Sequence, residues 1–306
     1  MKRIFFMLTA LTVIASCAQK QDLNLHIGSY NIRYQNSGDN ERGNSWESRC
    51  PVICDILNYE DFDVFGVQEA LDPQMEDLKA GLDGYACVGV GREDGAKKGE
   101  YAAIFYKTDR VKLIDWGTFW LSETPETVGS VGWDAALERI CTWAHLEKDG
   151  RAFWFMNMHM DHVGVVARRE SAKLVVSRIK EMCGDEKVIL TGDYNVDQTD
   201  EIYRIFTESG LLKDCYECAH HKLATNGTFN SYHTEYWTES RIDHLLVSPK
   251  FDVDRYAVLT YMRWQQLDNS EICKSQSCPN ELNFEVQSLR TPSDHYPVGA
   301  YIRLAE

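Results

Sequence analysis

In the stretch VILTGDYNVDQTD, residues 188–200, an apolar segment is followed directly by acid and amide side chains. Three apolar residues lead into a Thr-Gly pair, and Asp193 and Asn195 then follow two residues apart. Taken alone, the stretch fits a polar loop after a strand, with glycine and Asx residues supplying the turn. Whether it is more than a loop depends on how the other strands of the chain end.

Five further predicted strands carry acid, amide or imidazole groups at one end. These groups are Asn31, Glu69, His159, Asp243 and the pair Asp294-His295. Each has a purely structural alternative, such as a helix cap for Glu69, an Asx turn for Asn31, an interior histidine for His159 and a turn cap for Asp294. Polar groups at strand ends can be gathered from distant sequence into one cleft by a sheet scaffold. The repeated pattern therefore predicts a functional cleft.

The periodicity of the chain predicts an α/β fold in which strands outnumber helices. Alternating or apolar segments predict strands over residues 23–32, 62–70, 85–90, 101–106, 110–121, 139–147, 151–160, 186–193, 241–248 and 296–304. Helical spacing predicts helices over 46–60, 73–82, 167–183 and 199–210, the last with Thr199 as N-cap. Because the helices lie between groups of strands, we expect a four-layer α/β/β/α sandwich, with two mostly antiparallel sheets flanked by helices.

The first residues have the layout of a secretory signal rather than of a folded element. Lys2 and Arg3 precede an apolar run that is too short to span a membrane. The run ends in Ala15-Ser16-Cys17, which resembles the lipobox of bacterial lipoproteins, with an ordinary cleaved signal as the alternative. We expect an exported lipoprotein, periplasmic or anchored at the outer membrane or cell surface, that meets the membrane only through lipidated Cys17. The expected divisions are a signal peptide over 1–16, a tether over 17–22 and a single domain over 23–306.

The charge of the chain limits its partners. The formal charge is −15 and becomes about −17 without residues 1–16. Broad non-specific nucleic-acid binding needs clustered Lys and Arg and is therefore not expected, although a local basic cleft is compatible with this charge. We expect a monomer.

The cysteines leave two interpretations open. Nine remain besides Cys17, and an odd number cannot all pair within one chain. Cys215/Cys218 and Cys273/Cys278 have the spacing of local disulfides in an oxidising compartment. The first pair, with His220 and His221, also fits a zinc site, but no second ligand pair of standard spacing is evident.

The polar strand ends match a known family in order and local context. The stretches SYNIR, GVQEA, NMHMDH, LTGDYNV, RIDHLLV and SDHYPV resemble the endonuclease/exonuclease/phosphatase superfamily from about residue 23 to 303. The rest of the sequence is also similar to secreted bacterial members of this superfamily near its deadenylase-like branch. The resemblance implies hydrolysis of phosphate esters with Mg²⁺ or Mn²⁺.

The resemblance also implies a role for each polar residue. Glu69 is the main metal ligand, oriented by Asn31 or assisted by it through water, while Asp294 approaches a metal or orients His295. Asp193 activates the attacking water and Asn195 holds that water or a phosphate oxygen. His295 and His159 contact the phosphate, and Asp243 holds the His159 ring. Arg33 and His162 are further substrate-binding candidates. The number of metals, and whether Asp193 or His295 is the general base, stay open.

Departures from the family pattern narrow the range of expected substrates. Val196-Asp197 stands where inositol-polyphosphate phosphatases carry an arginine, and no Pro-x-Trp precedes Asp243. No exposed aromatic hairpin of the sphingomyelinase type is evident. The leading expectation is a phosphodiesterase acting on nucleic acid or on small or lipid-linked diesters, with a sugar- or inositol-phosphate phosphomonoesterase as the alternative. A catalytically inactive binding lipoprotein is the alternative of another class, and the intact residue set disfavours it.

Overall fold

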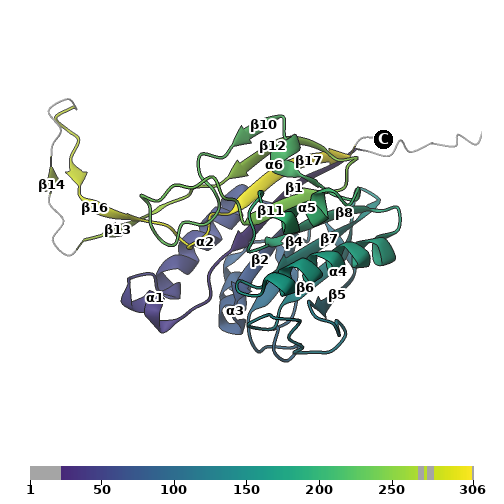
Figure 1. Cartoon of the computed structure of the whole chain (residues 1–306). Coiled ribbons are helices and arrows are strands. Elements are labelled where there is room, and N and C mark those ends of the chain that lie inside the picture. Colours follow the sequence, from purple (N-terminus) through teal and green to yellow (C-terminus); the bar gives the residue numbers. More distant parts are fainter. Residues whose placement is uncertain (1–21, 268–271, 274–278, 305–306) are drawn as a thin grey trace, which may run out of the picture.

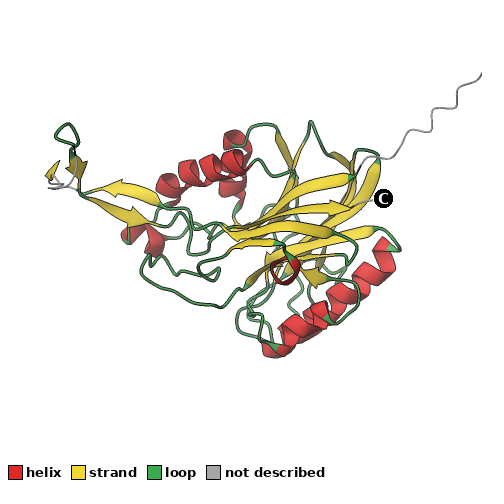
Figure 2. Cartoon of the chain, turned by 90° about the horizontal axis from the view of Figure 1, so that it is seen from above, coloured by secondary structure: helices red, strands yellow, loops and turns green. Residues whose placement is uncertain are grey.

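The computed structural model describes residues 22–267, 272–273 and 279–304. Two large mixed sheets pack face to face, and helices cover their two outer faces (Figures 1 and 2). The predicted α/β/β/α sandwich is therefore confirmed.

Within the described residues, the strands of each sheet follow an order that mixes near and distant sequence. One sheet has the order β10 (His221–Leu223), β12 (Asp252–Val258), β17 (Val298–Leu304), β1 (Leu23–Asn31), β2 (Val64–Ala70), β4 (Tyr101–Lys107) and β3 (Tyr85–Val88). The other has the order β5 (Lys112–Trp120), β6 (Ile140–Lys148), β7 (Arg151–His159), β8 (Lys187–Asp193), β11 (Asp243–Val247) and β9 (Lys213–Asp214). Neighbours are antiparallel except for the pairs β1/β2, β10/β12 and β7/β8, so the expectation of mostly antiparallel sheets holds.

The longer helices bury one face each against a sheet. In α2 (Trp46–Glu60), Trp46, Ile53 and Leu57 lie on the buried face and share one apolar cluster with side chains of α3 (Asp72–Gly81) and β2. The helices α4 (Val165–Cys183) and α5 (Glu201–Thr207) form a matching cluster with β7 and β8. Two short helices, α1 (Ser37–Glu41) and α6 (Cys215–Cys218), lie in connections.

A buried amide locks the two sheets together below the strand ends. Asn157 on β7 donates its Nδ2 to the carbonyl oxygens of Val67 and Ala103 at 3.0 and 2.9 Å, and its Oδ1 accepts from Gln68 Nε2 at 2.6 Å. The approach requires a glycine at position 66, where a Cβ would lie 2.3 Å from Asn157 Oδ1. Because a buried amide must be hydrogen-bonded, this contact fixes one relative position of the sheets.

One projecting hairpin was not expected from the sequence. Strands β13 (Arg263–Gln266) and β16 (Gln287–Arg290) pair and extend away from the sandwich, with β14 (Ile272–Cys273) and β15 (Phe284–Glu285) paired beyond them (Figure 1). Trp264 is 70% exposed on this hairpin, so the structure has an exposed aromatic residue on a hairpin that the sequence did not reveal. The short strands are rich in Gln and Arg, which hides them from a search for apolar alternation.

The start of α5 also differs from the expectation. Asp200, and not Thr199, is the N-cap, because Asp200 Oδ1 accepts a hydrogen bond of 2.7 Å from the Ile202 backbone N–H. Thr199 instead donates its hydroxyl to Asp197. The carboxylate is the stronger acceptor and lies in the right place one residue later.

The predicted termini and disulfides are only partly described. The expected signal peptide and Cys17 lie outside the described residues, as does Cys278 of the second predicted disulfide. Cys215 and Cys218 are free thiols, so the first predicted disulfide is absent. Of the helices described, none combines the length and the apolar character needed to cross a membrane.

Candidate active site

Strand register brings the polar strand ends to one edge of the sandwich. His159 pairs with Asp193 across β7 and β8, and Asp193 pairs with Asp243 across β8 and β11. In the other sheet Asn31 pairs with Gln68, next to Glu69. Because the sheets are packed face to face at this edge, residues from both sheets meet.

The meeting point is a cavity of about 410 Å³. Eight of the ten candidate residues line it: Arg33, Glu69, His159, His162, Asp193, Asn195, Asp294 and His295. The other two, Asn31 and Asp243, are fully buried directly behind it. The sequence therefore selected residues that the fold gathers in one place.

Three residues of the cavity have an unusual backbone. Arg33, Glu69 and Asn195 have φ angles of 60°, 67° and 50°, in the left-handed region that non-glycine residues seldom adopt. At Glu69 the conformation coincides with a bulge in the pairing of β2 with β4, which turns the side chain out of the alternating pattern. Backbone strain of this kind concentrates at functional sites.

Asn31 joins two of the carboxylates that line the cavity. Its Nδ2 donates to Glu69 Oε1 and to Asp193 Oδ2, both at 3.0 Å. Asp193 also accepts from the Asn195 backbone N–H at 2.9 Å, and Glu69 from that of Tyr34 at 3.2 Å. These donors hold both carboxylates in place in the cavity wall.

The Asp243 carboxylate holds His295 and not His159, so the predicted carboxylate–imidazole pairing was wrong. Asp243 Oδ2 lies 2.9 Å from His295 Nδ1, and His295 Nε2 points toward Asp193 Oδ2 at 3.8 Å. Burial lowers the pKa of His295, but the Asp243 and Asp193 carboxylates raise it further, to about 10. His295 is therefore an imidazolium at neutral pH and a donor toward the cavity.

His159 is held by Arg139, which the sequence did not identify. Arg139 Nη1 lies 2.9 Å from His159 Nε2, and Arg139 Nη2 lies 2.9 Å from His162 Nδ1. Asp161 in turn accepts from Arg139 Nε at 3.2 Å. Burial, together with Arg139, lowers the pKa of His159 to about 3. The only sign of Arg139 in the sequence was its position as a charged residue directly before a strand of buried residues.

His159 and His295, two of the three histidines of the cavity, therefore differ in charge. His159 is neutral, and its Nε2 already accepts from a guanidinium, so it has no free lone pair there for a proton. Burial and the nearby Asp243 carboxylate raise the pKa of Asp193, while His295 and His159 oppose this. Groups whose environments push their pKa values apart are typical of acid–base sites.

A second buried arginine fixes the loops around the cavity. Arg49 of α2 is fully buried and donates to the carbonyl oxygens of Ile32, Arg33, Asn44 and Pro292. It thereby ties the end of β1 to the segment that carries Asp294 and His295. Arg33, by contrast, lines the cavity with its Nη1 3.6 Å from Asp294 Oδ2.

The side chains at the cavity fit a divalent cation. Among the residues that the structure describes, only Glu69, Asp193 and His295 bring three metal-ligand atoms within 4.8 Å of one another. Magnesium and manganese prefer oxygen ligands, which the two carboxylates supply. The charged His295, engaged with Asp243, is better suited to donate to an anion than to bind a cation.

Comparisons with known proteins agree with this geometry. The family model described as Endonuclease/Exonuclease/phosphatase family matches residues 28–295. This chain belongs to the endonuclease/exonuclease/phosphatase family. A Bacteroides thetaiotaomicron protein of the same family is 45% identical with a TM-score of 0.86, over 93% of this chain and 99% of that one. The B. thetaiotaomicron mannosyl-6-phosphatase is also 45% identical, with a TM-score of 0.80 over 91% and 99% of the two chains.

More distant relatives are matched over part of their length. Drosophila melanogaster Nocturnin is 24% identical over 189 residues, which cover 56% of this chain and 28% of that protein. The chain spans less than two thirds of the length of the curated relatives it matches. Nocturnin among the relatives agrees with the predicted place near the deadenylase-like branch of the family.

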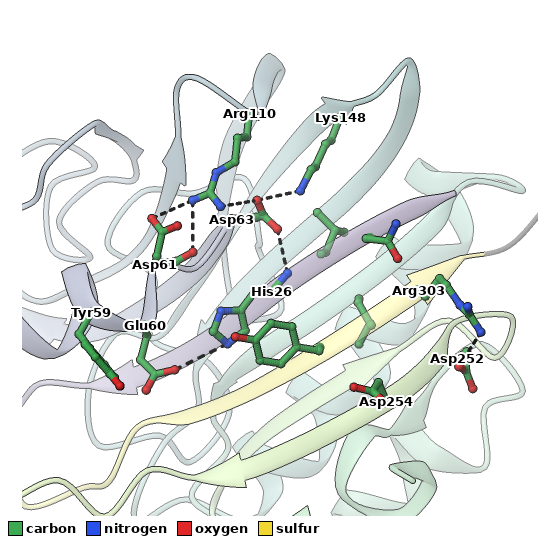
Figure 3. Close-up of a pocket in the computed structure, with 14 residues that line it drawn as sticks. His26, Tyr59, Glu60, Asp61, Asp63, Arg110, Lys148, Asp252, Asp254 and Arg303 are labelled. Carbon is green, nitrogen blue, oxygen red and sulfur yellow. Dashed lines mark hydrogen bonds and ion pairs between the residues drawn. The ribbon is translucent and has the colours of Figure 1, made fainter. Parts of the chain in front are cut away.

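The protein has a second cavity near the amino-terminal end of β1 (Figure 3). Its volume of about 690 Å³ exceeds that of the candidate active site. Its charged groups are paired with one another: Asp63 accepts from the His26 backbone N–H and from Lys148 Nζ, both at 2.8 Å, and lies 3.4 Å from Arg110. The His26 ring stacks on Tyr301 with centroids 3.8 Å apart. Paired charges and stacked rings give this cavity a structural role.

This packing predicts a pH dependence of stability. Burial lowers the pKa of His26 to about 4, against the opposing pull of Asp63. The folded state thus disfavours the protonated ring, and stability falls as the pH drops from about 6.5 to 4, by about 3 kcal/mol. Urea unfolding of His26→Gln should show a correspondingly smaller loss between pH 7 and 4. The control is His221→Gln, which replaces an exposed histidine, and equal slopes in all three proteins would contradict the assignment.

Proposed function

We propose that the protein is a divalent-metal-dependent phosphatase that removes a terminal phosphate from a sugar phosphate. The observation that carries the hydrolase assignment is the meeting of Asp193, Glu69 and a charged His295 in one cavity, with ligand atoms within 4.8 Å. A phosphate ester is anionic and resists attack by water. Its hydrolysis needs positive charge at the phosphate and a base for the water, and this cavity offers both.

The roles of the residues follow from their contacts. Asp193 accepts the proton of the attacking water, since its raised pKa makes it a better base than an exposed carboxylate. His295, held by Asp243, donates to a phosphate oxygen. Arg139 keeps His159 and His162 at the opposite wall. Water adds to phosphorus, the bond from phosphorus to the sugar oxygen breaks, and that oxygen takes up a proton.

Glu69 would hold Mg²⁺ or Mn²⁺, with Asp294 nearby, and Asp193 stays available as the base. When bound, such a cation would polarise the phosphate and offset its charge. Asn31 serves this site indirectly, because it orients the Glu69 and Asp193 carboxylates through its Nδ2. Burial raises the pKa of Asp294 to about 6, with a further contribution from Glu69, against the pull of His295 and Arg33.

Two observations favour a monoester over the diester that the sequence placed first. The mannosyl-6-phosphatase is similar over nearly its whole length at 45% identity. In addition, Arg33, Arg139 and the charged His295 line the cavity, together with the carboxylates of Glu69, Glu100, Asp193 and Asp294. A monoester carries one more negative charge than a diester near neutral pH, so the three positive groups suit it better once a divalent cation offsets the carboxylates.

A phosphodiesterase is the second candidate, and one feature supports it. The cavity shares Arg33 and Asp294 with a neighbouring cavity of about 560 Å³, and Phe229 and Ile242 with another of about 640 Å³. The two organic groups of a diester would have room on opposite sides of the phosphate.

We also propose that the protein is an exported lipoprotein anchored through Cys17, on the strength of the signal-like residues 1–16. A metabolic label with a clickable palmitate analogue in a bacterial host would mark the parent but not Cys17→Ala. Unlabelled parent protein would contradict this proposal.

The function is tested by a substrate comparison on the chain from residue 18 onward. Mannose 6-phosphate, p-nitrophenyl phosphate and bis-p-nitrophenyl phosphate are supplied with Mg²⁺, with Mn²⁺ or with chelator, and phosphate or nitrophenol release is measured. We expect chelator-sensitive release from the monoesters, at least tenfold faster than from the diester. A faster diester reaction would favour the second candidate, and release that chelator leaves unchanged would contradict the metal dependence.

A further inference from the structure

A cavity lined by aromatic side chains adjoins the catalytic cavity. It measures about 640 Å³ and lies against the segment of residues 225–240, which we call the aromatic loop. Phe229, Tyr236 and Trp237 of this loop are 42%, 54% and 66% exposed. Single exposed aromatic residues are ordinary, but three that share one cavity next to a catalytic site are not.

The aromatic loop is directly connected to the catalytic residues. Phe229 forms part of both cavities, and its ring stands edge-on to the His295 ring with centroids 5.0 Å apart. The backbone N–H groups of Asn230 and Ser231 donate to the Asp294 carbonyl oxygen at 2.7 and 3.1 Å. A substrate with its phosphate beside His295 would therefore extend along Phe229 into the aromatic cavity.

Hydrogen bonds hold the exposed rings in place. Trp237 Nε1 donates to the Thr225 carbonyl oxygen at 2.8 Å, although the side chain is two-thirds exposed. Asn226 bridges the loop by donating to the Tyr236 carbonyl oxygen and accepting from the Thr238 N–H, both at 2.9 Å. A flat apolar surface that is fixed before a ligand arrives loses little entropy on binding.

The polar groups of the aromatic cavity indicate the class of ligand. Among the described residues that line it there is no Lys, Arg or His. Ser231 offers a hydroxyl, and Glu235 offers a carboxylate whose Oε1 lies 3.0 Å from His233 Nδ1. The set fits an uncharged group with an apolar face and hydroxyl groups, and it offers nothing to a second phosphate.

We infer that the aromatic cavity is the subsite for the saccharide part of the substrate, the part that leaves when the bond to phosphorus breaks. A pyranose ring matches the lining because its C–H groups face an aromatic ring while its hydroxyl groups point to Ser231 and Glu235. This inference rests on the proposed phosphatase function and adds to it the place where the saccharide binds.

The kinetic test compares three variants on mannose 6-phosphate and on ethyl phosphate, which has no ring. For Trp237→Ala, the ratio of kcat/KM for mannose 6-phosphate to that for ethyl phosphate should fall about tenfold. Trp237→Phe keeps a stacking surface but loses the bond to Thr225, and it should retain the parent ratio within about twofold. The matched control Trp264→Ala removes an equally exposed tryptophan of the hairpin and should retain the parent ratio. An equal loss on both substrates, or an equal loss in Trp237→Phe, would overturn the subsite and leave Trp237 a structural role.

A binding test separates failure of the subsite from failure of the proposed function. Calorimetric titration with an unphosphorylated mannose disaccharide needs no catalysis, and we expect binding by the parent that Trp237→Ala abolishes. Binding without any phosphatase activity would contradict the function alone. A parent that does not bind the disaccharide, or that prefers adenosine 5′-monophosphate to mannose 6-phosphate through Trp237, would overturn the saccharide assignment.

Discussion

Replacing Asp193 with alanine should lower kcat by about 10² to 10⁴ on whichever phosphate ester the parent hydrolyses, because it removes the base for the attacking water. The fold should not lose stability in proportion. Asp193 is buried, and its pKa is raised by burial and by Asp243 directly across the strand pair, so its charged form is disfavoured in the folded protein. We therefore expect a thermal unfolding midpoint at or above that of the parent.

The control for this variant lies at the other end of the same strand. Asp185→Ala removes an exposed carboxylate just before β8 and should leave both kcat and the unfolding midpoint unchanged. If Asp193→Ala turned over substrate at the parent rate while remaining folded, Asp193 would not be the base.

Replacing Glu69 with glutamine should weaken the binding of Mn²⁺ or Mg²⁺ by at least 10- to 100-fold. Glutamine keeps the volume of the side chain and an oxygen, but it removes the negative charge that balances the cation. Isothermal calorimetry with the metal alone measures this without any substrate. The activity of the variant should need correspondingly more metal and should be restored in part at high concentration.

A second glutamate next in the chain provides the comparison. Glu76→Gln on α3 removes an exposed carboxylate that pairs with Lys79, and it should bind metal as the parent does. Identical metal titrations for Glu69→Gln and the parent would show that Glu69 is no ligand and would move attention to Asp294.

Much of the site was predictable because its residues mark strand ends. A run of apolar residues that stops at Asp193 or His159 is a local feature, and strand pairing then places such ends at one edge. The prediction failed where a contact crosses between segments. His159 and Asp243 lie on opposite sides of Asp193 in the strand order, and only the packing of the segment around residue 294 places His295 against Asp243. Arg139 and Arg49 were missed because a charged residue is normally exposed, and only contacts between distant segments bury these two.

The sequence by itself determined the longer strands and helices, the layer order and most of the residues that face the active site, but neither the projecting hairpin nor Arg139. Periodicity and residue chemistry are local properties, so they can be read along the chain. Only the tertiary structure decided which carboxylate holds which imidazole, which arginines are buried, and that the aromatic loop lies beside His295. Those features depend on the distance between segments that are far apart in sequence, and the packing of the two sheets, fixed in part by Asn157, sets that distance.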